Sequence, residues 1–426
     1  MVKVFKFGGA SVKSSEALRN LKRILSTVEY DTILMVVSAM GKTTNALERI
    51  LFSARNKTVE FEFLFSQLKN FHQNICIDLF DKDQPELNSE LEHLFSSLHH
   101  LLVHQEISLS YDEYYDQTVS YGELLATTIV GYYLIHEGFS LKVIDARLYV
   151  KTDQQFRSAT IDWQSTEERI KTLHQEFKHH TILLTQGFIG SSQEGLTTTL
   201  GREGSDFTAA IFAYCLEAEE VVIWKDVAGL LNADPKRFNA TQKLEQISYA
   251  EAIELAYYGA TVIHPKTIKP LQNKSIPLKV QSFLESNNAP SVIDKNAEYD
   301  TDIPSYIIKE NQLLISISPR DFSFMDEAKL HFIFGVFNAS KIHTNLIQTS
   351  AISLSVCIDD DSIKLNELLQ SLNKDYAVKY NNNLNLLTIR HYSEEDAKRS
   401  VESYKILLEQ RSRVTLQLVV KRLSQE

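Results

Sequence analysis

The sequence is poor in the residues that build disulfide frameworks, flexible linkers and membrane spans. Its 426 residues include 3 cysteines, 14 glycines and 8 prolines. Cys76, Cys215 and Cys357 form no Cys-x-x-Cys pair, so we expect neither a disulfide scaffold nor a zinc ribbon. Nowhere do about 18 apolar residues follow one another, and the first residues do not resemble a secretion signal. We therefore predict an ordered protein of a reducing compartment, the cytoplasm.

Basic residues are also in deficit. The chain has 44 Lys and Arg against 55 Asp and Glu, which gives a formal net charge of -11. This balance argues against a general surface for nucleic acid or for an anionic membrane. A few focused cations can still bind a small anion in an acidic protein. A chain of this length is expected to form two or three domains, since a typical domain has about 100–150 residues.

Strand and helix patterns alternate through the first part of the chain. β-branched and aromatic residues at 2–7 predict a strand, and the spacing at 14–28 predicts a helix. The nearly all-apolar run 32–37 is typical of a strand covered on both faces, and a helix through 47–51 follows it. The alternation predicts an α/β protein with an open, mainly parallel sheet between helical layers.

A polar stretch at 285–302 precedes a region with a different rhythm. Over 313–380 the predicted order is strand, helix, strand, strand, helix, strand, which is the α+β ferredoxin-like motif. Half of a second such unit follows it. The elements predicted for that half are a strand at 384–390, a helix at 394–409 and a strand at 414–420. We expect residues 1–308 to form one domain and residues 309–426 another.

A glycine pair follows the first predicted strand, in the segment that contains Lys6, Gly8, Gly9 and Ser11. Glycines let backbone N–H groups approach phosphate oxygens, the helix after Ser14 adds its dipole, and Lys6 adds a positive charge. The segment therefore suits a phosphate. The alternative is an ordinary strand-to-helix turn with a solvated lysine, because paired glycines are common in turns.

Polar residues also follow the second predicted strand and enter a long apolar helix. Ser38 and Thr44 are placed at the edge of the sheet where ligands of open α/β sheets bind, or they are local turn and cap partners. Glu123 lies early in the helix predicted at 119–136. It is positioned either to pair with a substrate ammonium or to interact favourably with the helix dipole.

A cluster of glycines between 182 and 212 indicates backbone that approaches something closely. Within it, Arg202 has a guanidinium suited to a carboxylate, and Asp206 falls in the first turn of a predicted helix. An Arg202–Asp206 ion pair that stabilises the turn is the alternative reading. Farther along, Lys225, Lys236 and Arg237 either hold a triphosphate or are surface charges.

The histidines do not indicate a metal. His93, His99, His100 and His104 lie close in sequence, but no set of carboxylates accompanies them, so we predict no metal site.

Together these segments resemble the aspartate kinases of the amino-acid kinase family, and the resemblance spans almost the whole chain. Seven blocks carry it in family order, which makes it highly specific. The blocks are Lys6 to Val12; Val37 to Ala39 with Thr44-Asn45; Ser120 to Glu123; Thr185 to Gly190; Thr197 to Arg202 with Gly204 to Asp206; Trp224 to Val227 with Asp234-Pro235; and Tyr258 to Ala260 with His264-Pro265.

The resemblance implies an enzyme that phosphorylates the β-carboxylate of L-aspartate with ATP, the first step toward lysine, threonine and methionine. It implies Lys6 and Asp206 as catalytic residues and Mg²⁺ held mainly through ATP. The residues that it implies for aspartate are Ser38, Thr44, Glu123, Arg202 and Asp206. Those that it implies for the nucleotide are Lys6, Gly8, Gly9, Ser11, Lys225, Asp226, Leu231, Lys236, Thr261 and Val262.

Several positions depart from the commonest family pattern. Ala10 stands for a threonine, Glu203 for a glycine, Lys236 for an arginine and Thr261 for a lysine that contacts the nucleotide. The plant-type enzymes resemble this chain in carrying a lysine at position 225 while lacking the later one. We therefore expect Lys225 to compensate for Thr261.

Residues 309–426 resemble the amino-acid-sensing ACT domains, with the second ACT unit incomplete. The match covers 342–350 and implies an effector, lysine by preference, at Thr349 and Ser350, although Ala351 stands where lysine-sensitive members have glutamate. It also implies a homodimer or a higher homo-oligomer, with no nucleic acid or membrane partner. Two rival functions are another small-molecule kinase of the same fold and a catalytically silent amino-acid sensor.

Overall fold

The computed structural model describes residues 1–104, 110–238, 240–260, 263–401 and 403–423. The chain forms two compact units, and each is described by itself. The first unit comprises Met1–Leu230, Lys243–Ile253 and Val262–Ala297; the second comprises Leu231–Gln242, Glu254–Thr261 and Glu298–Glu426.

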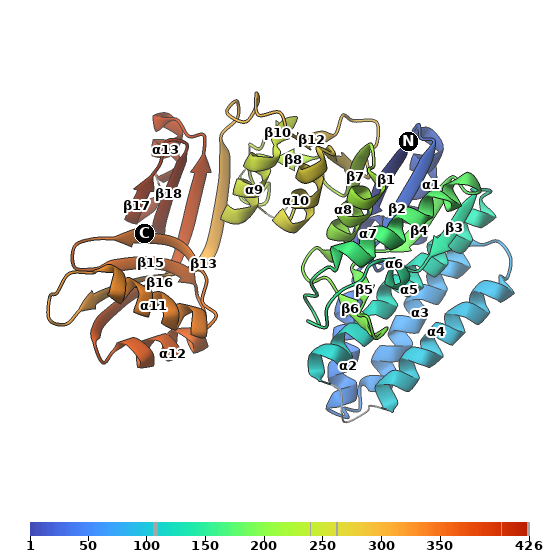
Figure 1. The fold of residues 1–426 in the computed structure, drawn as a ribbon, viewed down its shortest axis with the longest axis horizontal. Coiled ribbons are helices and arrows are strands. Elements are labelled where there is room, and N and C mark those ends of the chain that lie inside the picture. Colours follow the sequence, from blue (N-terminus) through green and yellow to red (C-terminus); the bar gives the residue numbers. More distant parts are fainter. Residues whose placement is uncertain (105–109, 239, 261–262, 402, 424–426) are drawn as a thin grey trace. The chain divides into compact units, whose positions relative to one another are not determined.

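An eight-stranded sheet forms the centre of the first unit (Figure 1). Its order is β10-β12-β11-β7-β1-β2-β4-β3, and every neighbouring pair is parallel except β11 with β12. The strands of this sheet are β1 (Val2–Phe7), β2 (Thr32–Val37), β3 (Leu141–Ile144), β4 (Ile182–Gln186), β7 (Glu220–Lys225), β10 (Gln246–Ser248), β11 (Leu278–Ser282) and β12 (Ser291–Asp294). Two small ribbons pair β5 (Ile189–Ser191) with β6 (Thr197–Thr199), and β8 (Leu230–Leu231) with β9 (Lys243–Leu244).

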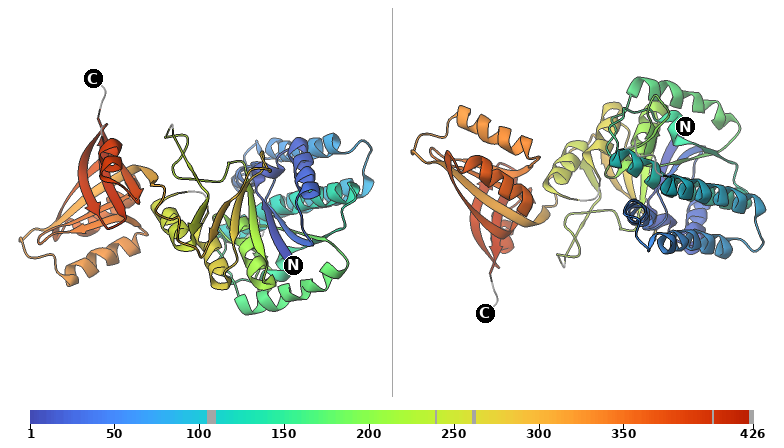
Figure 2. Two further views of the ribbon diagram at one scale, coloured as in Figure 1. Left: turned by 90° about the horizontal axis from the view of Figure 1, so that it is seen from above. Right: turned by 90° about the horizontal axis from the view of Figure 1, so that it is seen from below.

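Helices lie on both faces of this sheet, as Figures 1 and 2 show. The helices that lie wholly or partly in the first unit are α1 (Ser15–Thr27), α2 (Thr43–Arg55), α3 (Phe61–Leu79), α4 (Pro85–Val103), α5 (Tyr111–His136), α6 (Ala146–Tyr149), α7 (Trp163–Lys171), α8 (Gly204–Leu216), α9 (Tyr249–Tyr258) and α10 (Pro265–Lys274), with the 3-10 turns η1 (Gly9–Val12), η2 (Thr172–His174) and η3 (Glu176–Lys178). Helix α9 continues into the second unit.

Alternation along β1 separates the two layers of helices. Phe5 and Phe7 are fully buried in a core shared with α1 to α5. Successive side chains of a strand point to opposite faces, so Lys6 faces the other layer, where α8 packs on β1. The mainly parallel sheet between two helical layers confirms the predicted α/β fold class.

The strands of the site end side by side. Phe7 pairs with Val37 and with Trp224, and Val37 pairs with Gln186, so β1, β2, β4 and β7 end at one edge of the sheet. Open α/β sheets bind ligands at this carboxyl edge.

The second unit holds a six-stranded antiparallel sheet of order β14-β15-β13-β16-β18-β17. Its elements are β13 (Ser305–Pro319), α11 (Glu327–Ala339), β14 (Thr344–Thr349), β15 (Leu354–Asp359), α12 (Ser362–Leu372), β16 (Tyr376–Arg390), α13 (Glu394–Val401), β17 (Tyr404–Arg411) and β18 (Thr415–Arg422). The first six follow the βαββαβ order, which confirms the predicted ferredoxin-like α+β region.

The predicted helix over 394–409 is wrong in its second half. Helix α13 ends at Val401, and Tyr404–Arg411 is a strand on β18. Leu408 packs in an apolar cluster between strands, and this burial outweighs the local helical spacing.

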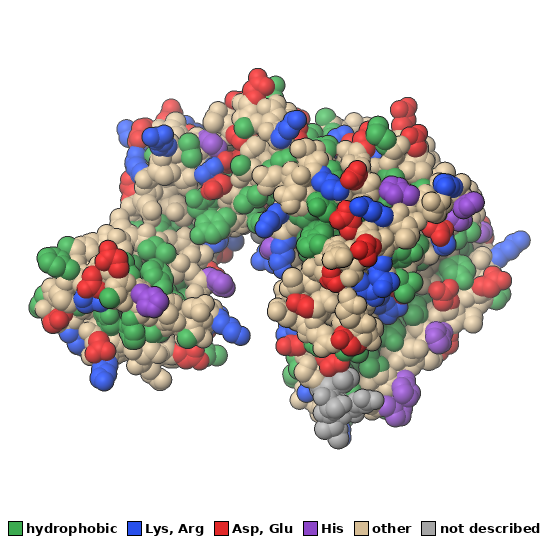
Figure 3. Space-filling view, in the orientation of Figure 1, with side chains coloured by type: hydrophobic (Ala, Val, Ile, Leu, Met, Phe, Trp, Pro, Cys, Tyr) green, Lys and Arg blue, Asp and Glu red, His purple; other side chains and the backbone are tan. Residues whose placement is uncertain are grey.

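Acidic and basic side chains are interspersed over the visible face of each unit (Figure 3). No helix within the described ranges is long and apolar enough to cross a bilayer.

Candidate active site

A buried carboxylate between two lysines forms the centre of the candidate site. Lys6 Nζ lies 2.6 Å from Asp206 Oδ1, and Lys225 Nζ lies 3.4 Å from Asp206 Oδ2. The Asp206 side chain is 3% exposed and that of Lys6 is 9% exposed. Burial alone would raise the pKa of Asp206, but the two ammonium groups hold that pKa below its ordinary value. Asp206 is therefore ionised at neutral pH.

Three elements bring these groups together. Lys6 comes from β1, Lys225 is the last residue of the neighbouring strand β7, and Asp206 lies in the first turn of α8. Helix α8 approaches closely because Gly187 has no side chain: a Cβ there would lie 2.5 Å from the Cβ of Ser205. The structure thus places Lys6 and Asp206, which the resemblance implied as catalytic residues, in direct contact.

The glycine turn after β1 borders the lysine. A Cβ on Gly8 would lie 3.3 Å from Lys6 Nζ, and one on Gly9 would lie 2.8 Å from the Ala39 carbonyl oxygen. Ser11 is buried, and its hydroxyl donates to the Trp224 carbonyl at 3.3 Å. The turn therefore leaves backbone close to the ammonium, while the Ser11 hydroxyl also fastens the turn to β7.

Glu123 is the second buried carboxylate of the site. The Ala39 N–H donates to Glu123 Oε1 at 3.3 Å, and Glu123 Oε2 has no hydrogen-bond partner among the described residues. Burial raises the pKa of Glu123 to about 8, although the Ala39 N–H and the charge of Lys6 oppose the shift. Ser38, next to Ala39, and Thr44 in the first turn of α2 are half-buried.

Arg202 does not pair with Asp206, so the ion-pair interpretation of this turn is wrong. Asp206 is bonded instead to Lys6 and Lys225, and Arg202 is exposed. The next residue, Glu203, has φ of 53° in the left-handed region, which favours glycine.

The remaining predicted nucleotide residues are Asp226, Leu231, Lys236, Thr261 and Val262. Asp226 is exposed just after β7. Leu231 is half-buried and Lys236 is exposed, and both belong to the second unit. Thr261 and Val262 lie outside the described residues.

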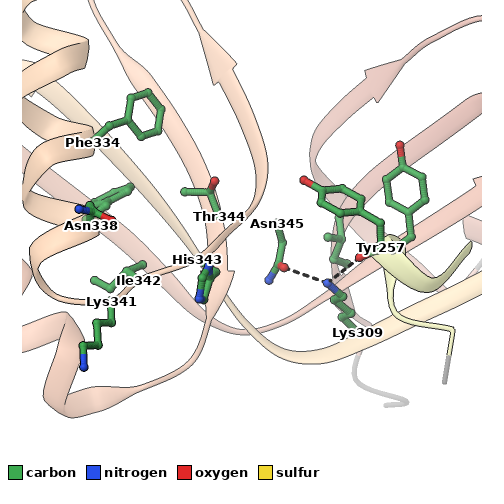
Figure 4. A pocket seen from close by; sticks show the side chains of 12 residues that line it. Tyr257, Lys309, Phe334, Asn338, Lys341, Ile342, His343, Thr344 and Asn345 are labelled. Carbon is green, nitrogen blue, oxygen red and sulfur yellow. Dashed lines mark hydrogen bonds between the residues drawn. The ribbon is translucent and has the colours of Figure 1, made fainter. Parts of the chain in front are cut away.

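A cavity of about 460 Å³ lies within the second unit, at the start of β14 (Figure 4). Lys309 Nζ donates to Asn345 Oδ1 at 2.9 Å at its wall, and Tyr257, Lys341 and His343 also line it. Thr349 and Ser350 are exposed at the other end of β14, and the Ser350 hydroxyl lies 2.7 Å from that of Ser353. One chain therefore does not bring the predicted effector residues to this cavity.

Among the described residues, no three His, Cys, Asp or Glu side chains lie close enough together to hold a metal ion.

Comparison with known proteins identifies the family. The model of the amino acid kinase family matches residues 1–282. The chain belongs to the amino acid kinase family. Chloroplastic aspartokinase 1 of Arabidopsis thaliana is 30% identical over 375 residues, which cover 86% of this chain and 65% of that protein. This amino acid kinase thus spans just under two thirds of the length of the Arabidopsis relative.

Other relatives of this amino acid kinase match over more of their length. Lysine-sensitive aspartokinase 3 of Escherichia coli K12 is 30% identical over 356 residues, covering 84% of this chain and 78% of that protein. The crystal structure of E. coli aspartokinase III with aspartate and ADP is 27% identical, with a TM-score of 0.82, and covers 99% of this chain and 96% of that chain. The expected resemblance to aspartate kinases is confirmed.

The titration of Glu123 gives a testable prediction. With a pKa of about 8 in the folded state against 4.5 ordinarily, Glu123 keeps its proton on folding between these pH values, where the unfolded chain has lost it. Its contribution to the free energy of unfolding therefore falls as pH rises through this window, by at most about 1.4 kcal/mol per pH unit. Glu123→Gln removes this contribution.

Chemical denaturation of wild type and Glu123→Gln from pH 5 to pH 8 measures the effect. The variant should gain stability relative to wild type as pH rises. The matched control is Glu168→Gln on the surface of α7, which should follow wild type. Parallel pH profiles for wild type and Glu123→Gln would show that Glu123 does not titrate in this window.

Proposed function

We propose that this protein transfers the γ-phosphoryl group of ATP to the β-carboxylate of L-aspartate. A carboxylate oxygen forms a bond to the γ-phosphorus, the bond from that phosphorus to the bridging oxygen breaks, and ADP leaves with 4-phospho-L-aspartate as product. The observation that carries the proposal is the buried Lys6–Asp206–Lys225 cluster at the carboxyl edge of the sheet. This would be the first step toward lysine, threonine and methionine.

The cluster suits phosphoryl transfer because it fixes two positive charges, one buried and one half-buried, beside a buried carboxylate. Such preorganised charges stabilise the charge that spreads over the transferring group. Lys6 serves the transferring phosphoryl group, and Asp206 holds both ammonium groups in place. The attacking β-carboxylate is already ionised at neutral pH, so the reaction needs no general base.

The residues proposed to bind the amino-acid substrate surround its α-ammonium and α-carboxylate groups, beginning with Glu123. The buried Oε2 of Glu123, without a partner among the described residues, accepts from the substrate α-ammonium together with Asp206, and the positive charge of that ammonium favours the ionised form of Glu123. The exposed Arg202 guanidinium holds the α-carboxylate, and Ser38 and Thr44 complete the pocket.

The nucleotide contacts two sets of residues in this proposal. Backbone of the glycine turn and the two lysines of the cluster face the phosphates. Because Asp206 is bonded to both lysines, we infer that Mg²⁺ enters with ATP and is held mainly through it. The proposed nucleotide residues are Lys6, Gly8, Gly9, Ser11, Lys225, Asp226, Leu231, Lys236, Thr261 and Val262.

A coupled assay of ADP release across amino-acid substrates tests the function. We expect turnover with L-aspartate and at least a hundredfold lower kcat/KM with L-glutamate, N-acetylglutamate or a nucleoside monophosphate. A buried polar site rejects ligands that leave its groups unpaired by factors of this size. Preference for any of the other substrates would assign a different kinase activity, and no turnover at all would support a silent sensor.

Lys225→Thr tests the compensation for Thr261. The variant removes one of two charges beside Asp206, so the KM for ATP should rise by tenfold or more, since a charge-assisted contact contributes about 1.5–3 kcal/mol. The control is Lys279→Thr on the neighbouring strand β11, where the lysine pairs with Glu220 instead. Steady-state kinetics would contradict the compensation if both variants kept the wild-type KM for ATP.

An effector site formed by two copies is the regulatory part of the proposal. β14 is an edge strand, and antiparallel pairing with its own copy would bring Thr349 and Ser350 of one chain near the start of β14 in the other. There the cavity wall offers the ammonium groups of Lys309 and Lys341, which suit the carboxylate of a free amino acid. We propose a homodimer, or a higher homo-oligomer built from it, that binds lysine.

Calorimetry with millimolar lysine, threonine and methionine tests this site. Lysine should bind and the other two should bind more weakly, and Ser350→Ala should weaken lysine binding. Absence of binding by all three, in protein with normal turnover, would assign the second unit to assembly instead.

The three cysteines are free and buried, which supports the proposed cytoplasmic location.

A further inference from the structure

A third buried carboxylate lies on α5, outside the set of residues assigned to the reaction. Asp116 is 0% exposed. The Thr199 N–H and hydroxyl each donate to it at 2.7 Å, to Oδ2 and Oδ1 respectively. The Arg157 N–H donates to both carboxylate oxygens, at 3.1 and 3.0 Å. Asp116 therefore holds two loops that are distant in sequence.

One of these loops continues to Arg202, and the other packs against the turn that carries Arg202. Thr199 is the last residue of β6, and Arg202 follows three residues later. Between them Gly201, with φ of 76°, packs on the Arg157 turn, where a Cβ would lie 3.1 Å from the Arg157 carbonyl oxygen. Asp116 thus fastens the turn that carries Arg202 and also the turn on which it rests.

The side chain of Arg157 does not bind Asp116 but contacts other residues. Its guanidinium lies 4.4 Å from the centre of the Tyr115 ring and pairs with Asp112 at 3.2 Å. Asp116 uses the backbone N–H of Arg157, so what it fixes is the path of the chain.

We propose that Asp116 is the positioning residue that sets Arg202 for the α-carboxylate of the substrate, an inference that rests on the proposed function. Asp116 precedes Glu123 by seven residues, which is about two helical turns and about 10 Å on one face of α5. The same rigid helix therefore presents Glu123 to the ligand and holds the loop that carries the opposite contact.

Asp116→Asn tests the inference through steady-state kinetics. The amide keeps the size of the side chain but places an NH₂ group against the donors of Thr199 or Arg157. We expect the KM for aspartate to rise at least tenfold and the KM for ATP to change less than twofold. In an Arg202→Ala background the same substitution should raise the aspartate KM less than twofold further. Equal changes in both KM values, or additive effects in this cycle, would overturn the inference.

Two further variants separate positioning from general stability. Asp162→Asn is the matched control, because Asp162 caps α7 in the same unit and accepts from Ser165; it should lower stability without changing the ratio of the two KM values. Should Asp116→Asn fail to fold, Thr199→Val should raise the aspartate KM selectively, whereas Thr199→Ser should not. An unchanged KM ratio in Thr199→Val would then overturn the inference.

Hydrogen exchange distinguishes this inference from the proposed function. Asp116→Asn, or Thr199→Val in its place, should speed amide exchange over 199–203 and leave that of α7 unchanged, whether or not the protein phosphorylates aspartate. If wild type shows no turnover with aspartate, the proposed function fails. The exchange result alone then decides whether Asp116 fixes the turn at 199–203. Unchanged exchange over 199–203 would overturn the positioning role.

Discussion

The ionised carboxylate of Asp206 is the interaction on which the site depends. Two ammonium groups next to each other inside a protein repel each other. Asp206 lies between Lys6 and Lys225, and its negative charge offsets this repulsion. The three groups meet because the parallel strands β1 and β7 end side by side and carry the two lysines. The close contact of Gly187 with Ser205 brings the first turn of α8, with Asp206, up to these strands.

Helix α5 imposes the second constraint. It is buried along most of its length, yet it carries carboxylates at Asp116 and Glu123. Their environments differ: Asp116 accepts from three donor groups, whereas one oxygen of Glu123 has no partner among the described residues. A satisfied carboxylate stabilises its surroundings, while an unsatisfied one costs stability until a ligand meets it. The first suits a structural support and the second suits substrate binding.

The sequence predicted the α/β class and the βαββαβ region because the spacing of apolar residues along a strand or helix follows which of its faces is buried. It missed Asp116, since a lone aspartate in an apolar helix gives no sign of loops that reach it from 157 and 199. It also suggested an ion pair of Arg202 with Asp206, because the two residues are close in sequence. The spacing could not show that β1 and β7 supply lysines that pair with Asp206 instead. The strand at Tyr404–Arg411 was missed because pairing with β18 overrides its local pattern. The domain limits and the roles of the site residues stay predictions.

The most direct test of the central claim compares aspartate-dependent ADP formation by wild type and Asp206→Asn, with circular dichroism to verify folding. The substitution keeps the shape of the side chain but removes the charge that holds both lysines. The account predicts turnover in wild type and a loss of at least a hundredfold in the folded variant, which corresponds to about 2.7 kcal/mol of transition-state stabilisation. Wild-type protein that forms no ADP with aspartate, or a folded variant that keeps its rate within threefold, would contradict it.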